Sequence, residues 1–303
     1  MQILYGFKGS ESDDIKVLER TLIRSMEEMY DLYLLIMSLL IEVQKRAELH
    51  LSSSKNKHLA TKEDINPNYK FVNNAVLAQI IQNKDLADEL KSRKINNWEM
   101  DGEYVDVIFK ALIKSDLYKR NMENTDDSYK ADKAFLLDVF KNIVAPNDKL
   151  YDYLEDKNLT WIDDLPVVNT IIVKLIKKLE PDAPSKSILP NLYKDEEDKS
   201  FGIELLTKTI LNLTSLNKII SEKTQNWDKD RIANVDLVLL QLAIIEFQKF
   251  PSIPVKVTIN EYLEIAKEYS TPKSSVFING ILDKLIKEYE AKGTLNKAGR
   301  GLM

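Results

Sequence analysis

The side chains most often used for catalysis or metal binding are scarce in this chain of 303 residues. It has no cysteine, and its two histidines, His50 and His58, both lie beside a polar stretch rich in Ser, Lys and Asn. A disulfide framework is therefore excluded, and a zinc site built from Cys or His is disfavoured. No Ser, His and acidic residues form a credible catalytic triad, and the sparse glycines form no phosphate-binding run. We expect a binding protein that is not an enzyme, with no cofactor and no metal.

The polar residues that carry most information lie in the last quarter of the chain, between residues 226 and 283. They occupy positions typical of helix caps and turns, next to amphipathic stretches. Thr258 followed by Glu261 is a capping-box pattern, which predicts that a helix starts at Thr258. A preceding helix, starting near Arg231, has one buried stripe and polar residues that cannot all hide on it: Asp236, Gln241 and Glu246. We interpret this segment as a recognition surface.

Helices must position these groups, because the composition favours helix along the whole chain. Apolar residues make up 44% and charged residues 30%, with only 8 Gly and 9 Pro, as expected for long helices joined by modest loops. From Ile15 to about Leu51 there is neither Gly nor Pro, which predicts one long helix or two in series. Pro166 is expected to open a later helix. Further helical patterns follow at about 70–91, 103–121 and 130–144.

Charge and hydropathy limit where the protein acts. A net charge of −5 and a pI near 5.4 give no general attraction to a phosphate backbone, so RNA contact needs a local basic patch or a partner. The most apolar window, residues 32–41, is far shorter than the roughly 20 residues that span a bilayer. No secretory signal follows Met1. We expect a cytoplasmic protein that does not contact a membrane.

A faint internal repeat links two parts of the chain. Residues 132–135 (Asp-Lys-x-Phe) recur as residues 198–201, and Trp161 matches Trp227 at the same offset. Two explanations stay open, a degenerate duplication that covers residues 130–180 and a coincidence between two Lys-rich amphipathic helix pairs.

Several ordered motifs identify the last third of the chain. They are Arg231-Ile232, Val235-Asp236, Leu242-Ala243, Glu246, Pro254, Ile259-Asn260-Glu261 and Phe277-Ile-Asn-Gly-Ile-Leu-Asp283. In this order they resemble the NusB family of bacterial transcription antitermination factors. Asp198, Phe201 and Leu205-Leu206 extend the resemblance upstream, and so does the opening run Met-Gln-Ile-Leu-Tyr at residues 1–5.

This resemblance implies an all-α, NusB-like fold of two packed three-helix units, enlarged by an inserted helical region. We expect residues 1–15 to be the remnant of its first helix and residues 196–290 to be its core. Residues 16–195 are then a helical insertion, which would include any copy at 130–180, and residues 291–303 a flexible tail. The family has an Arg-rich segment before its first-helix motif, so we expect the true start of the protein to lie upstream.

The resemblance also implies a function. It predicts binding of a boxA-type ribosomal RNA leader together with the ribosomal protein NusE, which helps RNA polymerase to resist termination. The RNA-binding residues implied are Gln2, Lys8, Lys273, Ser274, Phe277 and Asn279. The partner-binding residues implied are Tyr5, Asp236 and Glu246, with Asp236 as an exposed carboxylate. Such positions could supply planar groups for stacking and cations for phosphates.

A second function stays open, that of a helical protein–protein adaptor without RNA binding, in which the region from 20 to 195 is the working part. A ribosomal RNA methyltransferase that carries a NusB-like domain is excluded, because such an enzyme needs a cysteine nucleophile and a Gly-rich cofactor loop.

Overall fold

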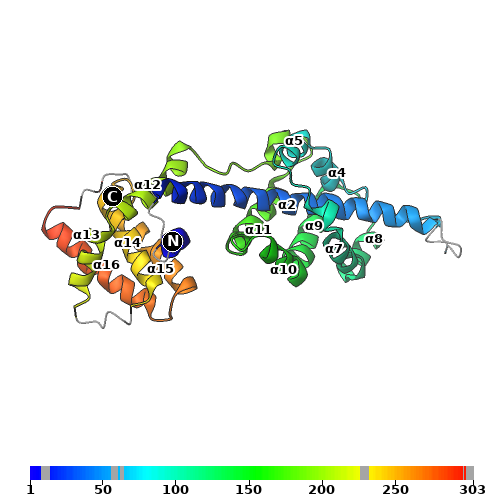
Figure 1. Cartoon of the computed structure of the whole chain (residues 1–303). Helices are drawn as coiled ribbons and strands as arrows, with labels where there is room; N and C mark the ends of the chain where they lie inside the picture. Colours follow the sequence, from blue (N-terminus) through cyan, green and yellow to red (C-terminus); the bar gives the residue numbers. More distant parts are fainter. Residues whose placement is uncertain (8–13, 56–60, 62–64, 226–231, 296, 298–303) are drawn as a thin grey trace. The chain divides into compact units, whose positions relative to one another are not determined.

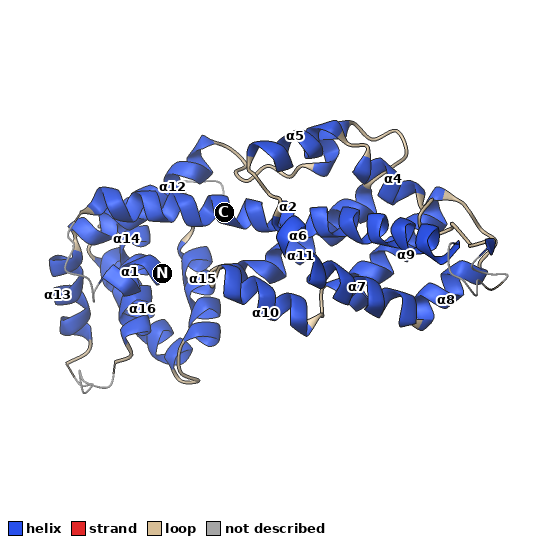
Figure 2. Cartoon of the chain, turned by 45° about the vertical axis from the view of Figure 1, so that its right-hand side comes forward, coloured by secondary structure: helices blue, strands red, loops and turns tan. Residues whose placement is uncertain are grey.

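The structure is a computed structural model that describes residues 1–7, 14–55, 61, 65–225, 232–295 and 297. All regular elements in these ranges are helical, and Figure 2 shows no strand among them. This confirms the all-α prediction. The chain divides into two compact units, which we call unit 1 (residues 1–24 and 193–303) and unit 2 (residues 25–192).

The long helix predicted from the Gly- and Pro-free stretch is a single element. Helix α2 spans Ile15–Lys55, which settles the choice between one helix and two in series. Its first turns, up to Arg24, belong to unit 1 and the remainder belongs to unit 2. A helix of this length lacks breakers inside it, in agreement with the sequence.

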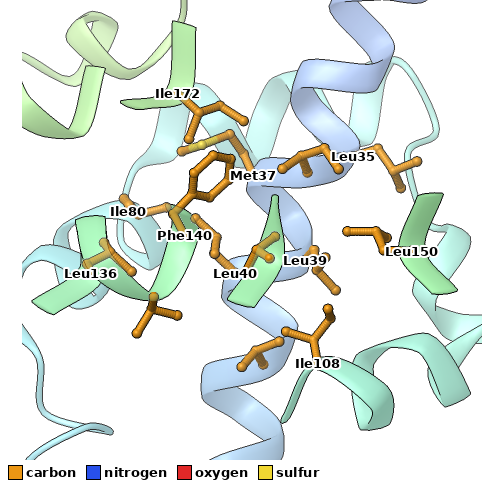
Figure 3. Packing of buried hydrophobic residues seen from close by; sticks show 14 of the residues in the cluster. Leu35, Met37, Leu39, Leu40, Ile80, Ile108, Leu136, Phe140, Leu150 and Ile172 are labelled. Carbon is orange, nitrogen blue, oxygen red and sulfur yellow. The ribbon is translucent and has the colours of Figure 1, made fainter. Parts of the chain in front are cut away.

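Unit 2 surrounds the middle of α2, where residues 32–37 are almost completely buried. Figure 3 shows Leu35, Met37 and Leu39 of α2 packed among apolar side chains from several other helices, Phe140 and Ile172 included. The helices that contribute apolar residues to the core of unit 2 are α2, α4 (Ala75–Ile81), α5 (Lys84–Ser92), α6 (Asn97–Met100), α7 (Gly102–Lys114), α8 (Asp116–Glu123), α9 (Tyr129–Val139), α10 (Asp148–Lys157) and α11 (Trp161–Lys178). A π-helical turn (Phe140–Val144) and a 3-10 turn (Ser185–Ile188) complete the unit.

Several helices of unit 2 begin at a side-chain cap. The capping oxygens come from Asn74, Asn83, Ser115, Ser128 and Asn147. Each accepts a hydrogen bond from a backbone N–H in the first turn that follows, which satisfies a donor that has no partner within the helix. These five helix starts are therefore stabilised by a residue directly before the helix.

One predicted helix start is wrong. Pro166 lies inside α11, which begins at Trp161. The start moves upstream because the side chain of Trp161 is buried and its Nε1–H donates to the carbonyl of Glu28 at 2.9 Å. Pro166 is the sixth residue of the helix, so it removes one intrahelical hydrogen bond, the one that an N–H at this position would donate to the carbonyl of Ile162.

Unit 1 is built around one central helix, α14 (Asn234–Lys249). Residues 238–247 of this helix are all buried, because its sequence is apolar on nearly every side. The helices packed against it are α1 (Gln2–Phe7), α12 (Glu196–Leu211), α13 (Leu213–Lys223), α15 (Val255–Tyr269) and α16 (Ser274–Ala291) (Figure 1). The opening residues of the chain thus share a core with its last third.

Candidate functional site

The first candidate residues lie on the short helix α1. Leu4 is 2% exposed and packs into the core of unit 1, which fixes the helix against α14. Gln2 and Tyr5 are three residues apart, so they lie on one side of the helix. Both are exposed, and Tyr5 leaves 49% of its surface accessible. Lys8, the third candidate near the N-terminus, lies outside the described residues.

The second group lies at the start of α16. Lys273 precedes the first residue of this helix and is exposed. Phe277 and Asn279 are half-buried, and Phe277 packs against the core of unit 1. Since the N-terminal end of a helix carries a partial positive charge, Lys273 adds a full charge to an end that already favours anions.

Asp236 is a correction to the sequence-based expectation. It is 5% exposed, so the prediction of an exposed carboxylate is wrong. Its Oδ1 accepts a hydrogen bond from Ser270 Oγ at 2.5 Å, and its Oδ2 accepts one from Ser274 Oγ at 2.8 Å. The reason is local chemistry, because the turn between α15 and α16 supplies hydroxyl donors that replace water around the carboxylate.

Ser274 therefore faces the interior. It is 1% exposed, and its Oγ also lies 2.8 Å from Thr271 Oγ1 and accepts from the N–H of Thr271 at 3.2 Å. The side chain predicted to meet RNA instead ties the start of α16 to Asp236 of α14. The structure brings Asp236 and Ser274, one residue from each predicted surface, into one buried hydrogen-bonded cluster.

Glu246 is buried in the same way on another side of α14. Its carboxylate accepts hydrogen bonds from Thr258 Oγ1 at 2.5 Å and from Tyr262 OH at 3.0 Å. Burial, with the adjacent Glu246 carboxylate adding to it, raises the pKa of Tyr262 well above its ordinary value. The tyrosine therefore remains a neutral hydrogen-bond donor.

The predicted capping box at Thr258 and Glu261 is wrong for a related reason. Helix α15 begins at Val255, directly after Pro254, so Thr258 lies inside the helix. Pro254 is the residue before the helix, with an extended backbone (φ −63°, ψ 141°), and the helical conformation starts at the next residue. The hydroxyl of Thr258 therefore does not cap the helix and instead donates its hydrogen bond to the carboxylate of Glu246.

Gln241 completes the polar set of α14. It is fully buried, and its Nε2 donates to Asn217 Oδ1 of α13 at 2.7 Å. The three residues do not share one buried stripe, as expected, yet Asp236, Gln241 and Glu246 are all buried. The prediction missed that α14 has more than one buried side. Helices α1, α12, α13, α15 and α16 all pack against α14, and each of the three residues meets a different neighbour. The Oε1 of Gln241 is buried without a hydrogen-bond partner.

Lys297 is a contact that the sequence did not indicate. Its Nζ donates to the carbonyls of Glu246 at 3.0 Å and Phe250 at 2.9 Å. Each of these carbonyls already accepts a backbone hydrogen bond, from the N–H of Phe250 or of Ile253. The lysine adds a second one and places a cation at the negative end of the helix. Burial lowers the pKa of Lys297. A lysine among otherwise polar tail residues gives no signal of such a role.

The described part of the chain has no group of three His, Cys, Asp or Glu residues arranged to hold a metal ion. None of its helices combines the length and apolar character required to cross a membrane. Unit 1 thus presents two groups of candidate side chains, Gln2 and Tyr5 on α1 and Lys273, Phe277 and Asn279 at the start of α16. Buried hydrogen bonds to Asp236 of α14 hold the second group in place.

Comparison with known proteins points to one family. A model described as the NusB family matches residues 167–287. The transcription antitermination protein NusB of Chloroherpeton thalassium is 40% identical over 129 residues, which are 42% of this chain and 61% of that protein. The NusB protein of Salinibacter ruber is 39% identical over 112 residues, 37% of this chain and 70% of that protein. The NusB protein of Alkaliphilus oremlandii is 40% identical over 94 residues, 31% of this chain and 68% of that protein.

The extent of these matches is limited. The chain spans about three fifths of the length of the Chloroherpeton relative. The family match starts at residue 167, within α11 of unit 2, and leaves the preceding part of unit 2 unmatched. No solved structure matches the chain.

Proposed function

Because the chain belongs to the NusB family, we propose that it acts in transcription antitermination. In this proposal it binds a boxA-type ribosomal RNA leader together with the ribosomal protein NusE, as part of an RNA polymerase complex that resists termination, and it catalyses no reaction. The observation that carries the proposal is the similarity to curated antitermination proteins at about 40% identity.

The exposed residues of unit 1 are the proposed contacts. Gln2 and Lys273 would meet the RNA, with Phe277 and Asn279 at the edge of that surface. An exposed lysine at a helix start can pair with phosphate, and amide groups can read base edges of single-stranded RNA. Lys8 remains a proposed RNA contact. Tyr5, half-exposed beside a buried Leu4, is the proposed contact for the protein partner.

Asp236, Glu246 and Ser274 have a different proposed role. Their side chains are at most 6% exposed, so they would support binding by holding α14, α15 and the start of α16 together. Asp236 and Ser274 are bonded directly to each other, so a change in either would move the segment that carries Lys273.

The test is a titration of labelled boxA RNA with the chain alone, with NusE alone and with both proteins. The expected result is RNA binding that the pair strengthens by about tenfold or more over either protein. Because the RNA contacts are partly ionic, affinity should fall as salt rises. If the chain binds neither the RNA nor NusE at low salt, the proposal is wrong.

Two surface variants sharpen the test. Lys273→Glu should weaken RNA binding several-fold and lower the salt slope by about 0.7 or more, because one phosphate contact is lost. Tyr5→Ala should weaken NusE binding without changing RNA binding by the chain alone. Lys218→Glu on α13 makes the same charge change at another exposed position of unit 1 and should leave both affinities unchanged.

The adaptor function remains the second candidate. Most of unit 2 lies outside the family match, and this unit has its own extensive apolar core. Binding of NusE without any RNA binding, at low salt where ionic contacts are strongest, would favour an adaptor over an antitermination factor.

A further inference from the structure

Unit 2 contains a groove of about 660 Å³ between α2, α4, α5 and α6. Most of its lining is apolar, with Ile41, Ile80, Ile81, Leu86, Leu90 and Trp98 among the lining residues. Ile41, Ile81 and Leu90 are half-buried, so they present aliphatic surface to whatever enters. The groove lies outside the part of the chain that matches the family model.

The buried polar side chains of the groove, those of Ser38 and Asn83, already have hydrogen-bond partners. Ser38 Oγ accepts from Trp98 Nε1 at 2.9 Å and donates to the carbonyl of Leu35 at 2.8 Å. The Asn83 side chain accepts from the N–H of Leu86 at 2.8 Å and donates to a backbone carbonyl. An extended peptide or a nucleotide would therefore find few partners for its polar groups, whereas a helix satisfies its own backbone and offers only side chains.

The rim of the groove is unbalanced in charge. Lys45 pairs with Glu42 at 2.7 Å. Lys91 and Lys94 are exposed, and their ammonium groups have no ion pair or hydrogen bond with any described residue. Glu99 is the remaining acidic residue in the lining. Two unpaired cations against one carboxylate favour an occupant that carries acidic side chains.

The backbone at Lys94 adds an independent observation. Its φ is +57°, and it is the single residue other than glycine with positive φ among those that the structure describes. It follows the end of α5, where the N–H of Ile95 donates to the carbonyl of Leu90 and that of Lys94 to the carbonyl of Lys91. This position of a Schellman motif usually holds glycine, since other residues are strained there. The chain instead places a lysine beside the groove.

We infer that this groove binds an acidic amphipathic helix of a partner protein. The helix would lay aliphatic or aromatic side chains at helical spacing over Ile41, Ile81 and Leu90, and its acidic residues would face Lys91 and Lys94. This is the helix-in-groove mode of recognition. Met100, one residue beyond Glu99, leaves 86% of its surface exposed and offers a flexible apolar contact next to the lining.

The test is selection of displayed random peptides of about 16 residues, some four helical turns, on the full-length chain. The expected consensus has apolar residues at i, i+3 or i+4, and i+7, with Asp or Glu between them. The best synthetic peptide is then titrated calorimetrically against four variants. The double variant Lys91→Glu with Lys94→Glu reverses the charge of the rim, and Ala87→Trp fills the groove from an exposed lining position. Lys94→Gly removes one cation. Lys84→Glu is the matched control, because Lys84 lies on the same helix as Lys91 but outside the lining.

Affinity should fall about tenfold or more for the charge-reversed double variant and for Ala87→Trp, and be unchanged for Lys84→Glu. Lys94→Gly separates a binding role from a structural one. It should weaken peptide binding about three- to tenfold while raising the melting temperature by about 1–3 °C, because glycine relieves the strained backbone. Thermal melts of the other variants show whether they are folded.

Several results would overturn the inference. These are a basic consensus or none, equal binding of the peptide by all variants, or a fall in the melting temperature of Lys94→Gly without a loss of affinity. Self-association that Ala87→Trp abolishes would assign the groove to a second copy of this chain instead. If no peptide is enriched, and the chain binds dodecanoate but the charge-reversed variant does not, the groove would be assigned to a small amphipathic anion.

Discussion

The buried carboxylate of Asp236 provides the sharpest test of how unit 1 is held together. It is 5% exposed and accepts hydrogen bonds from Ser270 and Ser274 at 2.5 and 2.8 Å. Hydrogen bonds to a charged group contribute about 1.5–3 kcal/mol each, and removing the carboxylate also removes its desolvation penalty. Asp236→Ala should therefore lower the free energy of unfolding by about 2–4 kcal/mol. Asp236→Asn, which keeps one acceptor oxygen, should cost about half as much.

The assay is urea unfolding of the full chain followed by circular dichroism, with the change in midpoint read at constant slope. Asp283→Ala, at an exposed position of α16, is the control and should stay within about 0.5 kcal/mol of the wild type. A double-mutant cycle with Ser270→Ala isolates the pair, and its coupling should be about 1 kcal/mol or more. If Asp236→Ala is as harmless as the control, the carboxylate is solvated and the reasoning fails.

The same variants also show whether Asp236 contacts the protein partner directly or only stabilises the surface that does. If Asp236 acts only by fixing the start of α16, Asp236→Asn should keep its affinity for NusE wherever it remains folded. A folded Asp236→Asn that loses about tenfold or more in affinity would instead return this carboxylate to the interface.

Three further predictions concern other polar groups. Thr258→Val deletes the hydroxyl on Glu246 at nearly constant volume and should lower the free energy of unfolding by about 2 kcal/mol in urea, whereas Thr258→Ser should recover most of it. Burial, and next the negative charge of Asp163, raise the pKa of Asp164 to about 6, whereas an aspartate in the unfolded chain has a pKa of roughly 3.9. Ionisation of Asp164 therefore lowers the stability of unit 2 as the pH rises from about 4 to beyond 6. Urea unfolding of Asp164→Asn should then show a gain of about 1 kcal/mol at pH 8, discounted for partial exposure, and none near pH 4. Arg93 donates to three carboxylates at 2.8–2.9 Å, so Arg93→Met should cost about 2–4 kcal/mol in the same assay and Arg93→Lys should recover only part, because lysine lacks the planar fork. A neutral effect of any of the three would contradict its assignment.

The helices of this protein could be predicted because their signals are local. The interruption-free stretch from Ile15 predicted α2, and apolar residues at helical spacing predicted the helical stretches at about 70–91, 103–121 and 130–144. Each of these three stretches is divided into two elements in the structure, and α6 and α10 were not predicted. Helix starts depended on more than local patterns. Helix α15 begins directly after Pro254 and not at the capping-box pattern of Thr258. Helix α11 begins at Trp161 and not at Pro166, because the Trp161 indole donates to the carbonyl of Glu28, which is far away in the sequence.

The burial of Asp236, Gln241 and Glu246 depended on which helices cover α14, and no local pattern specifies that. One available signal was overlooked. Residues 237–247 are apolar at almost every position, and a helix that is apolar all round is expected to be central. Applied to α14, that rule predicts a helix without a solvated face, whose few polar residues must find partners inside the protein.

The spacing of these three residues explains what they contribute beyond stability. A helix that is apolar on all sides can pack in several rotational settings with similar burial, so apolar contacts alone do not fix it. Asp236, Gln241 and Glu246 follow at intervals of five residues, and each interval turns the direction around the helix by about 140°. They therefore point to three sides of α14, where Asp236 meets the turn before α16, Gln241 meets α13 and Glu246 meets α15. Any rotation of α14 would leave buried polar groups unpaired, at a cost of about 1–3 kcal/mol each. The buried polar residues thus set the angle at which α14 holds its neighbours, and with it the position of the exposed residues at the start of α16.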